Sequence, residues 1–247
     1  GQTAWQYLSQ EDYMVLKKSH DFRLDRWTRD NNISWALTLL LRHAASFENK
    51  AVVLKPDGCV LVSELVKFRM LRILGADAAE IDRVMKVTSR GQKIRFIEKR
   101  VGGELVELGA GQGHSGDAHK QLDDDKHLNR KTKDQVPRWC IHGTKKQFTD
   151  SISKNGLLPG GNRGEKHRAH VHLVKFVNKS GETSGMRGGS DAFVKVDMHR
   201  LMDDGAEVFE SVNGVFLTSG LWLKGQASER CIGIPPRSLY GIILSRI

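Results

Sequence analysis

The chain has 247 residues, with 39 lysines and arginines against 29 aspartates and glutamates, a formal net charge of +10. Apolar residues make up 39 %, which is enough for one large domain or two modest lobes and excludes a wholly disordered tail, a collagen and a coiled coil. No apolar run approaches the roughly 20 residues needed to cross a bilayer, and the N-terminus does not resemble a signal peptide. We therefore expect a soluble intracellular protein, cytoplasmic or nuclear, without a membrane partner.

The positive charge is spread along the chain. Residues 1–120 hold 19 basic and 15 acidic side chains (net +4), and residues 121–247 hold 20 and 14 (net +6). A basic folded surface favours a polyanionic partner, RNA or DNA, although a merely solvated surface is the alternative. The cysteines Cys59, Cys140 and Cys231 lie far apart in apolar contexts, which predicts reduced core thiols rather than disulfides or a zinc site.

Residues 1–30 form an N-terminal extension without a clear pattern. A helix is expected from Asn32, as its N-cap, because apolar residues then recur at helical spacing, with Arg42 and His43 projecting outward. A second short helix is predicted over 63–70. Asp77-x-x-Glu80 is typical of a capping box before a third helix.

The pattern then changes to a period of two residues on both sides of Gly102–Gly103, over 93–97 and 104–108, which predicts a β-hairpin. Helices followed by a small hairpin predict a winged-helix-like lobe over 31–115. Residues 116–136 are almost devoid of apolar side chains and are predicted as a polar linker.

The last part of the chain, residues 137–247, is predicted as a mostly β lobe. One helix is expected over 145–155, ending at Gly156. Short apolar segments predict strands over 138–141, 169–174, 192–196, 208–210, 215–217 and 240–244. The predicted fold class is therefore α+β.

Two motifs point to chemistry that we do not expect. Residues 111–116 match G-x-G-x-x-G, but they follow a hairpin and precede a polar segment, whereas a dinucleotide fingerprint opens a helix. The trio His167, His170 and His172 lacks a completing cysteine or carboxylate and is surrounded by basic side chains. The run Asp123–Asp125 is interpreted as a solvated charge cluster, so no metal site is predicted.

Several arginines lie beside histidines or glycines: Arg42 next to His43, Arg95, Arg168 and Arg187. Arginine binds phosphate in a bidentate manner, and histidine can add a donor. Each arginine alone could equally be an ordinary surface or ion-pair residue. Convergence of several would make a phosphate pocket.

A series of short segments, in the right order, resembles the motifs of the RNA 2′-phosphotransferases, the NAD-dependent enzymes that finish tRNA splicing. Their L-S-x-x-L-R-H, D-G-[WF]-V, K-x-R-F and Q-G-H-S motifs resemble residues 37–43, 57–60, 92–96 and 112–115. Their H-G-T, G-L, R-x-H-[VI]-H-L, G-x-R-H-G and N-G-V motifs resemble residues 142–144, 156–157, 168–173, 185–189 and 213–215.

The resemblance implies a winged-helix-like lobe and an ADP-ribosyltransferase-like β lobe, with NAD as co-substrate between them and no metal. It implies that the catalytic residues are Arg42, His43, Arg95 and Arg168. The implied NAD-binding residues are His142, Gly143, Thr144, Gly156, Leu157, His172, Leu173, Arg187, Asn213, Gly214 and Val215.

In the family's reaction, an internal RNA 2′-phosphate attacks the ribose of NAD and nicotinamide leaves. The resulting 2′-phospho-ADP-ribosyl RNA is resolved to 2′-hydroxyl RNA and ADP-ribose 1″,2″-cyclic phosphate. The implied partner is an RNA with an internal 2′-phosphate, such as spliced tRNA, and we expect a monomer.

The chain departs from the family at three positions. Gly109 and Gly111 stand where the family often has arginine and asparagine, and Gly188 stands where it has histidine. Two alternatives therefore stay open. One is a basic RNA-binding module without catalysis, and the other is ADP-ribosylation of another nucleic-acid or protein acceptor.

Overall fold

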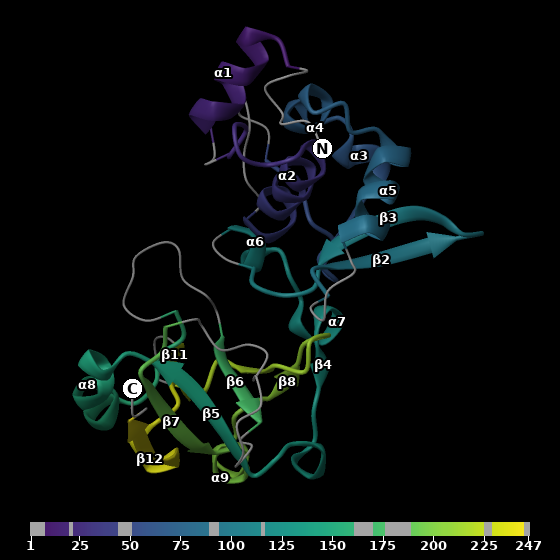
Figure 1. Ribbon diagram of the computed structural model, residues 1–247. Helices are drawn as coiled ribbons and strands as arrows, with labels where there is room; N and C mark the ends of the chain where they lie inside the picture. Colours follow the sequence, from purple (N-terminus) through teal and green to yellow (C-terminus); the bar gives the residue numbers. More distant parts are fainter. Residues whose placement is uncertain are drawn as a thin grey trace. The chain divides into compact units, whose positions relative to one another are not determined.

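The computed structural model describes residues 8–19, 22–43, 51–88, 94–114, 117–160, 170–175, 189–224 and 229–244 (Figure 1). They form helices and antiparallel sheets, so the predicted mixture of α and β structure is confirmed. The chain divides into two compact units, Gly1–Asp123 (unit 1) and Asp124–Ile247 (unit 2). Each unit has its own buried apolar core. Among the described residues, no helix has both the length and the apolar character needed to span a bilayer.

Unit 1 combines short helices with an antiparallel sheet of three described strands in the order β1-β3-β2. The predicted hairpin is confirmed, and its turn places Gly102 and Gly103 at φ angles of 59° and 90°, where glycine carries no steric penalty. The elements are α1 (Gln10–Ser19), α2 (Arg29–His43), β1 (Cys59–Leu61), α3 (Val62–Leu65), α4 (Arg69–Ile73), α5 (Ala78–Thr88), β2 (Phe96–Val101), β3 (Glu104–Ala110) and α6 (Asp117–Lys120).

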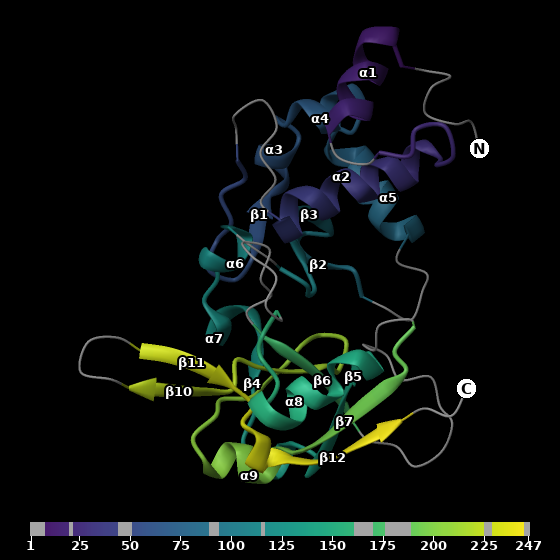
Figure 2. The same ribbon diagram turned by 90° about the vertical axis from the view of Figure 1, so that its left-hand side faces the viewer.

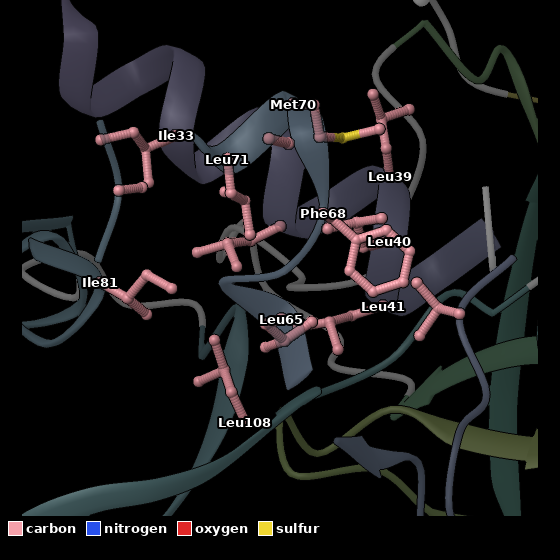
Figure 3. Close-up of a cluster of buried hydrophobic side chains, with 14 of the residues drawn as sticks. Ile33, Leu39, Leu40, Leu41, Leu65, Phe68, Met70, Leu71, Ile81 and Leu108 are labelled. Carbon is pink, nitrogen blue, oxygen red and sulfur yellow. The ribbon is translucent and has the colours of Figure 1, made fainter. Parts of the chain in front are cut away.

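Helix α2 forms the centre of the unit 1 core. Its apolar side chains are buried together with residues of α3, α4, α5 and β3, and Figure 3 draws Leu40, Leu71 and Leu108 among them. The helix begins earlier than predicted, at Arg29, so Asn32 is not its N-cap. Asn32 is instead buried inside the helix, where its Nδ2 donates to the carbonyl oxygen of Thr28 at 3.0 Å.

The segment after β1 also differs from the prediction of one helix over 63–70. Two short helices, α3 and α4, replace it, because Phe68 has extended backbone angles (φ −74°, ψ 129°) that interrupt the helix. The N-terminal cap at Asp77 is confirmed, since its carboxylate accepts from the backbone N–H of Glu80 at 2.8 Å. The Glu80 side chain pairs with Arg29 and Arg83, both in unit 1.

Unit 2 contains a seven-stranded antiparallel sheet in the order β12-β7-β5-β6-β9-β8-β4 and a separate β10–β11 pair, counting the described residues. Figure 2 shows this sheet with α8 in front of it. The elements are α7 (Asp124–His127), β4 (Asn129–Arg130), η2 (Lys133–Gln135), β5 (Trp139–Thr144), η3 (Lys146–Phe148), α8 (Thr149–Asn155), β6 (Val171–Lys175), β7 (Ala192–Asp197), α9 (Met198–Asp203), β8 (Phe209–Glu210), β9 (Phe216–Thr218), β10 (Leu221–Lys224), β11 (Glu229–Gly233), η5 (Pro236–Ser238) and β12 (Leu239–Leu244).

One face of this sheet forms the core of unit 2. Alternate residues of the central strands, such as Cys140, Leu173 and Val194, are fully buried with side chains of α8 and α9. The predicted helix over 145–155 begins as the 3₁₀ turn η3 and continues as α8. Gly156 ends α8 at a φ of 83°, which confirms its predicted place.

After the predicted linker, unit 2 contains elements that were not predicted, namely α9, β10, β11 and η5. The segment predicted as a polar linker, residues 116–136, contains α6 and then α7, β4 and η2. Cys59 and Cys140 are buried free thiols, as expected. Burial raises the pKa of Cys59 to about 11 and that of Cys140 to about 12, so both are protonated at neutral pH. The prediction for Cys231 falls outside the described side chains.

Candidate active site

Arg42 and His43 are the last two residues of α2. The helix is fixed by its buried leucines, so these two side chains leave a rigid support rather than a loop. Arg42 is partly exposed, although its Nε is buried, and His43 is exposed. The charge of Arg42 is favoured at this position by the partial negative charge of a helix C-terminus.

Arg95 lies directly before β2 and extends toward the same helix. Its Nη2 donates to the hydroxyl oxygen of Thr38 at 3.4 Å, and Thr38 in turn donates to the carbonyl oxygen of Ser34 at 2.8 Å. Thr38 is four residues before Arg42, so the two share one face of α2. The guanidinium of Arg95 therefore approaches the face of the helix that carries Arg42.

The segment after β3 completes this part of unit 1. The backbone N–H of Gly111 donates to the carbonyl oxygen of Arg95 at 3.0 Å. Gly113 has a φ of 87°, and a Cβ built on it would lie 3.9 Å from Nη1 of Arg42. This segment thus lies beside both arginines, and we name Arg42, Arg95 and Gly113 together the arginine cluster.

Arg95 differs from three other arginines of unit 1 in its partners. Arg29, Arg83 and Arg100 each bind a carboxylate. Among the described residues, Arg95 forms no ion pair. Its guanidinium contacts the hydroxyl of Thr38 and lies over the ring of Phe96, with its central carbon 5.7 Å from the ring centroid. A guanidinium without a carboxylate partner favours an anionic ligand.

Gly109, one of the departures from the family motif, has a packing role in unit 1. It pairs with Cys59 in the β1–β3 ladder. A Cβ at Gly109 would come within 3.0 Å of both the Cys59 sulfur and the carbonyl oxygen of Gly58. A side chain there would require β1 to shift. The packing of unit 1 therefore explains why this position is a glycine, without reference to any ligand.

In unit 2, the ring of His142 contacts the backbone of His172 at the point where strands β5 and β6 separate. Both residues are predicted site residues. The two strands pair only at Cys140–Lys175 and Ile141–Val174 among the described residues. Beyond that point, β5 continues along β7 while β6 continues along β9. The ring of His142 lies at this separation, with its Nδ1 2.9 Å from the carbonyl oxygen of His172.

The hydrogen bonds of these histidines indicate which ring nitrogen donates. A carbonyl oxygen can only accept, so Nδ1 of His142 is the donor, and in the uncharged form of the ring Nε2 is then an acceptor. The same holds for His172, whose Nδ1 lies 3.2 Å from the carbonyl oxygen of His170. His170 is bound through its Nε2 to Asp124 at 2.8 Å. Sequence analysis considered His170 only as a metal ligand and missed this partner, which no local spacing indicates.

Asp191, another residue that the sequence analysis missed, binds the backbone at the end of β5. Its backbone N–H donates to the carbonyl oxygen of Thr144 at 3.1 Å, and its carboxylate accepts from the backbone N–H of Lys146 at 2.6 Å. These bonds fix the course of the chain immediately after Gly143 and Thr144. Both predicted residues are partly exposed on an ordered strand end.

Other predicted residues of unit 2 serve packing or turns. The side chains of Leu157, Leu173 and Val215 are buried, so only their backbone atoms could reach a ligand. Gly156 is buried against the backbone of β11's end. Asn213 and Gly214 form a tight turn before β9, in which Gly214 has a φ of 71° and its N–H donates to the carbonyl oxygen of Ser211 at 2.9 Å.

Two predicted site residues, Arg168 and Arg187, lie outside the described residues, as does His167. In unit 1, the ligand atoms of Asp57, Cys59 and Glu107 lie close enough to one another to hold a metal ion. The two carboxylates already bind Lys99, however, and burial raises the pKa of the Cys59 thiol, which disfavours the thiolate a metal requires.

The comparison with known proteins agrees with the sequence motifs. The model of the RNA 2′-phosphotransferase, Tpt1 / KptA family matches residues 28–220. The chain is similar to tRNA 2′-phosphotransferase 1 of Danio rerio (32 % identical over 196 residues, 78 % of this chain and 80 % of that protein). It is also similar to tRNA 2′-phosphotransferase of Saccharomyces cerevisiae (30 % over 200 residues, 80 % and 82 %) and to a probable RNA 2′-phosphotransferase of Pseudomonas syringae pv. tomato (29 % over 198 residues, 78 % and 92 %). The matched residues include the arginine cluster and the histidines of β5 and β6, and the chain therefore belongs to the RNA 2′-phosphotransferase, Tpt1 / KptA family.

Proposed function

We propose that this protein removes an internal 2′-phosphate from RNA, with NAD as co-substrate, and that spliced tRNA is its natural substrate class. The observation that supports the proposal is the arginine cluster, in which Arg95 contacts Thr38 on the face of α2 that carries Arg42. The names of its relatives, tRNA and RNA 2′-phosphotransferases, support the substrate. The element order supports a winged-helix-like unit 1 and an ADP-ribosyltransferase-like unit 2.

In this proposal, the arginine cluster binds the RNA phosphate. A phosphate monoester is already anionic at neutral pH. The enzyme must therefore bind and orient it, and no base is needed to activate it. Two guanidinium groups offset its charge and restrict its rotation, which lowers the barrier by positioning and electrostatic stabilisation. His43, at the end of the same helix, can donate a hydrogen bond to a phosphate oxygen. The family resemblance adds Arg168 to the proposed catalytic residues.

Unit 2 supplies the residues proposed to hold NAD, and their chemistry fits such a ligand. The ring nitrogen Nε2 of His142 and of His172 is an acceptor that suits the hydroxyl groups of a ribose. Thr144 adds a hydroxyl group, and Gly143 leaves the strand without a side chain beside them. When bound, NAD supplies the ribose carbon that receives the phosphate and the nicotinamide that leaves. The protein residues orient this ribose and exclude water.

The direct test incubates the pure protein with a 2′-phosphorylated oligonucleotide and NAD, followed by mass spectrometry. We expect loss of the phosphate from the oligonucleotide and release of nicotinamide, both dependent on NAD. An oligonucleotide that stays unchanged while NAD binds in a calorimetric titration would contradict the proposal. It would favour ADP-ribosylation of a different acceptor, which labelled NAD with RNA, DNA and protein acceptors would identify.

A further inference from the structure

A group of aromatic and basic side chains lies on the face of the unit 2 sheet opposite its core. Trp139 of β5 and Tyr240 of β12 have ring centroids 4.7 Å apart, with their planes tilted by 59°. The Nζ of Lys195, on β7, lies 4.3 Å from the Trp139 centroid and 4.6 Å from the Tyr240 centroid. We name these three residues the stacking platform. None of them belongs to the site described above.

Strand alternation explains the position of this platform. Cys140, Val194 and Val196 are fully buried on the core face, so their neighbours Trp139 and Lys195 lie on the other face. The three strands are adjacent at one edge of the sheet, as Figure 2 shows.

Tyr240 lies at an irregularity of the edge strand. The pairing of β12 with β7 shifts between Leu239 and Gly241, which leaves Tyr240 without a partner residue in β7. Such a bulge reorients a side chain relative to the sheet. Tyr240 is 68 % exposed, an unusual state for an aromatic ring that already has a neighbouring ring and a cation. The ring is thus both accessible and held in place.

The charged side chains around the two rings indicate which class of ligand this surface fits. Arg138 is exposed, and its guanidinium carbon lies 5.1 Å from the Trp139 centroid. The carboxylate of Asp197 pairs with Arg138 at 3.3 Å. Exposed rings next to cations match a single-stranded nucleic acid, whose bases stack and whose phosphates are anionic. A proline-rich peptide would use the rings but not the cations.

We propose that the stacking platform binds an unpaired nucleotide of the RNA substrate, with the base stacked on Tyr240 and the adjacent phosphate near Lys195. This inference rests on the proposed function only in taking RNA as the ligand. It assigns an RNA contact to unit 2 in addition to the phosphate contacts of the arginine cluster in unit 1.

The test measures binding of the full chain to an unmodified, fluorescently labelled single-stranded RNA by anisotropy at low salt. We expect Tyr240→Ala to weaken the Kd about five- to tenfold, because one stacking contact is lost. Tyr240→Phe keeps the ring and should stay within about twofold of the wild type. Lys195→Gln should weaken binding and reduce its salt dependence, whereas Lys133→Gln, a surface control on η2, should do neither.

Any of three results would contradict the proposed nucleotide contact. The first is an unchanged Kd for Tyr240→Ala, and the second is an equal loss of affinity for Tyr240→Ala and Tyr240→Phe. The third is duplex RNA that binds as tightly as single-stranded RNA and loses the same affinity in Tyr240→Ala. Because the RNA carries no 2′-phosphate, this assay does not depend on turnover. If turnover of a 2′-phosphorylated RNA is found, Tyr240→Ala should raise KM and leave kcat unchanged. Failure of the proposed function alone would abolish turnover and leave the anisotropy result intact.

Discussion

Arg95 illustrates how a single side chain can be assigned from its partners. A surface arginine that serves stability usually binds a carboxylate, as Arg83 and Arg100 do in the same unit. Arg95 instead places its guanidinium on the hydroxyl of Thr38, a weak partner at 3.4 Å. A neutral hydroxyl compensates little of the charge, so a phosphate would be a much stronger partner. Its present contact therefore holds the side chain in position without competing with an anionic ligand.

We expect Arg95→Ala and Arg42→Ala each to lower kcat for 2′-phosphate removal by at least about tenfold, since each removes a charge-assisted contact to the phosphate. Arg95→Lys should recover part of the loss, because it restores the charge without the bidentate geometry. Single-turnover assays with 2′-phosphorylated RNA measure this. Arg72→Ala, which removes an exposed arginine of α4, is the control. A wild-type rate for Arg95→Ala would remove it from the proposed site.

At the scale of the element, the end of α8 depends on the backbone segment that directly follows β11. Leu157 and Ile234 exchange two backbone hydrogen bonds, both of 2.9 Å. This bridge brings the two backbone segments so close together that a Cβ on Gly156 would collide with the carbonyl oxygen of Ile234. Gly156 also has φ 83° and ψ −172°, a region reserved for glycine.

Gly156→Ala should therefore lower the free energy of unfolding by about 3 kcal/mol or more, through backbone strain and steric overlap together. The matched control is Gly205→Ala. Gly205 also has a positive φ, of 100°, but a Cβ there meets nothing within 4 Å, so only about 1 kcal/mol should be lost. Urea unfolding of both variants measures the difference. Equal losses would show that strain alone acts at Gly156.

The three-stranded sheet of unit 1 is joined by charged groups as well as by its ladders. Glu107 of β3 binds Lys55, which precedes β1, and Lys99 of β2. Hydrogen bonds from these two lysines lower the pKa of Glu107 below its usual value. A carboxyl group whose pKa is lower in the native state stabilises it above the unfolded-state pKa. This stabilisation is lost as the pH falls through the native-state value.

Glu107→Gln should accordingly reduce the free energy of unfolding at neutral pH by at most about 1 kcal/mol. The difference from wild type should shrink as the pH is lowered from about 5 to about 3, because the wild-type carboxyl then becomes protonated. Denaturant unfolding at several pH values measures it. Glu104→Gln is the control, since Glu104 is exposed on the same strand and forms no ion pair among the described residues. A difference that is independent of pH would contradict this role.

Local patterns were sufficient for some elements and insufficient for others. The hairpin at Gly102–Gly103 is encoded by adjacent residues, and the sequence predicts it correctly. Helix α9 was missed because it follows β7 without a loop: Asp197 ends the strand and caps the helix, accepting from the N–H of Arg200 at 3.1 Å. The contact of His142 with His172 depends on the pairing of β5 with β6, which no local spacing specifies. The family motifs supplied these residues, but not their contact.

At the scale of the whole molecule, the two units carry different parts of the proposed chemistry. The arginine cluster belongs to unit 1, and the histidines of β5 and β6 belong to unit 2. Each set is supported by the buried core of its own unit. Both halves of the sequence have a basic excess, +4 and +6, which favours a polyanionic partner such as RNA. These features predict that binding of NAD and processing of the phosphate can be separated by substitution.

Calorimetric titration with NAD alone tests this separation. His142→Ala should weaken the Kd for NAD about five- to tenfold, because a partly buried hydrogen-bonding group is lost. Arg42→Ala should leave the same Kd within about twofold while lowering phosphate removal. His142→Asn distinguishes a ligand contact from support of the strand, since its amide can still donate to the His172 carbonyl oxygen but lacks Nε2. If His142→Asn binds NAD as tightly as the wild type, His142 only supports β6. If Arg42→Ala abolishes NAD binding, the proposed division between the units is wrong.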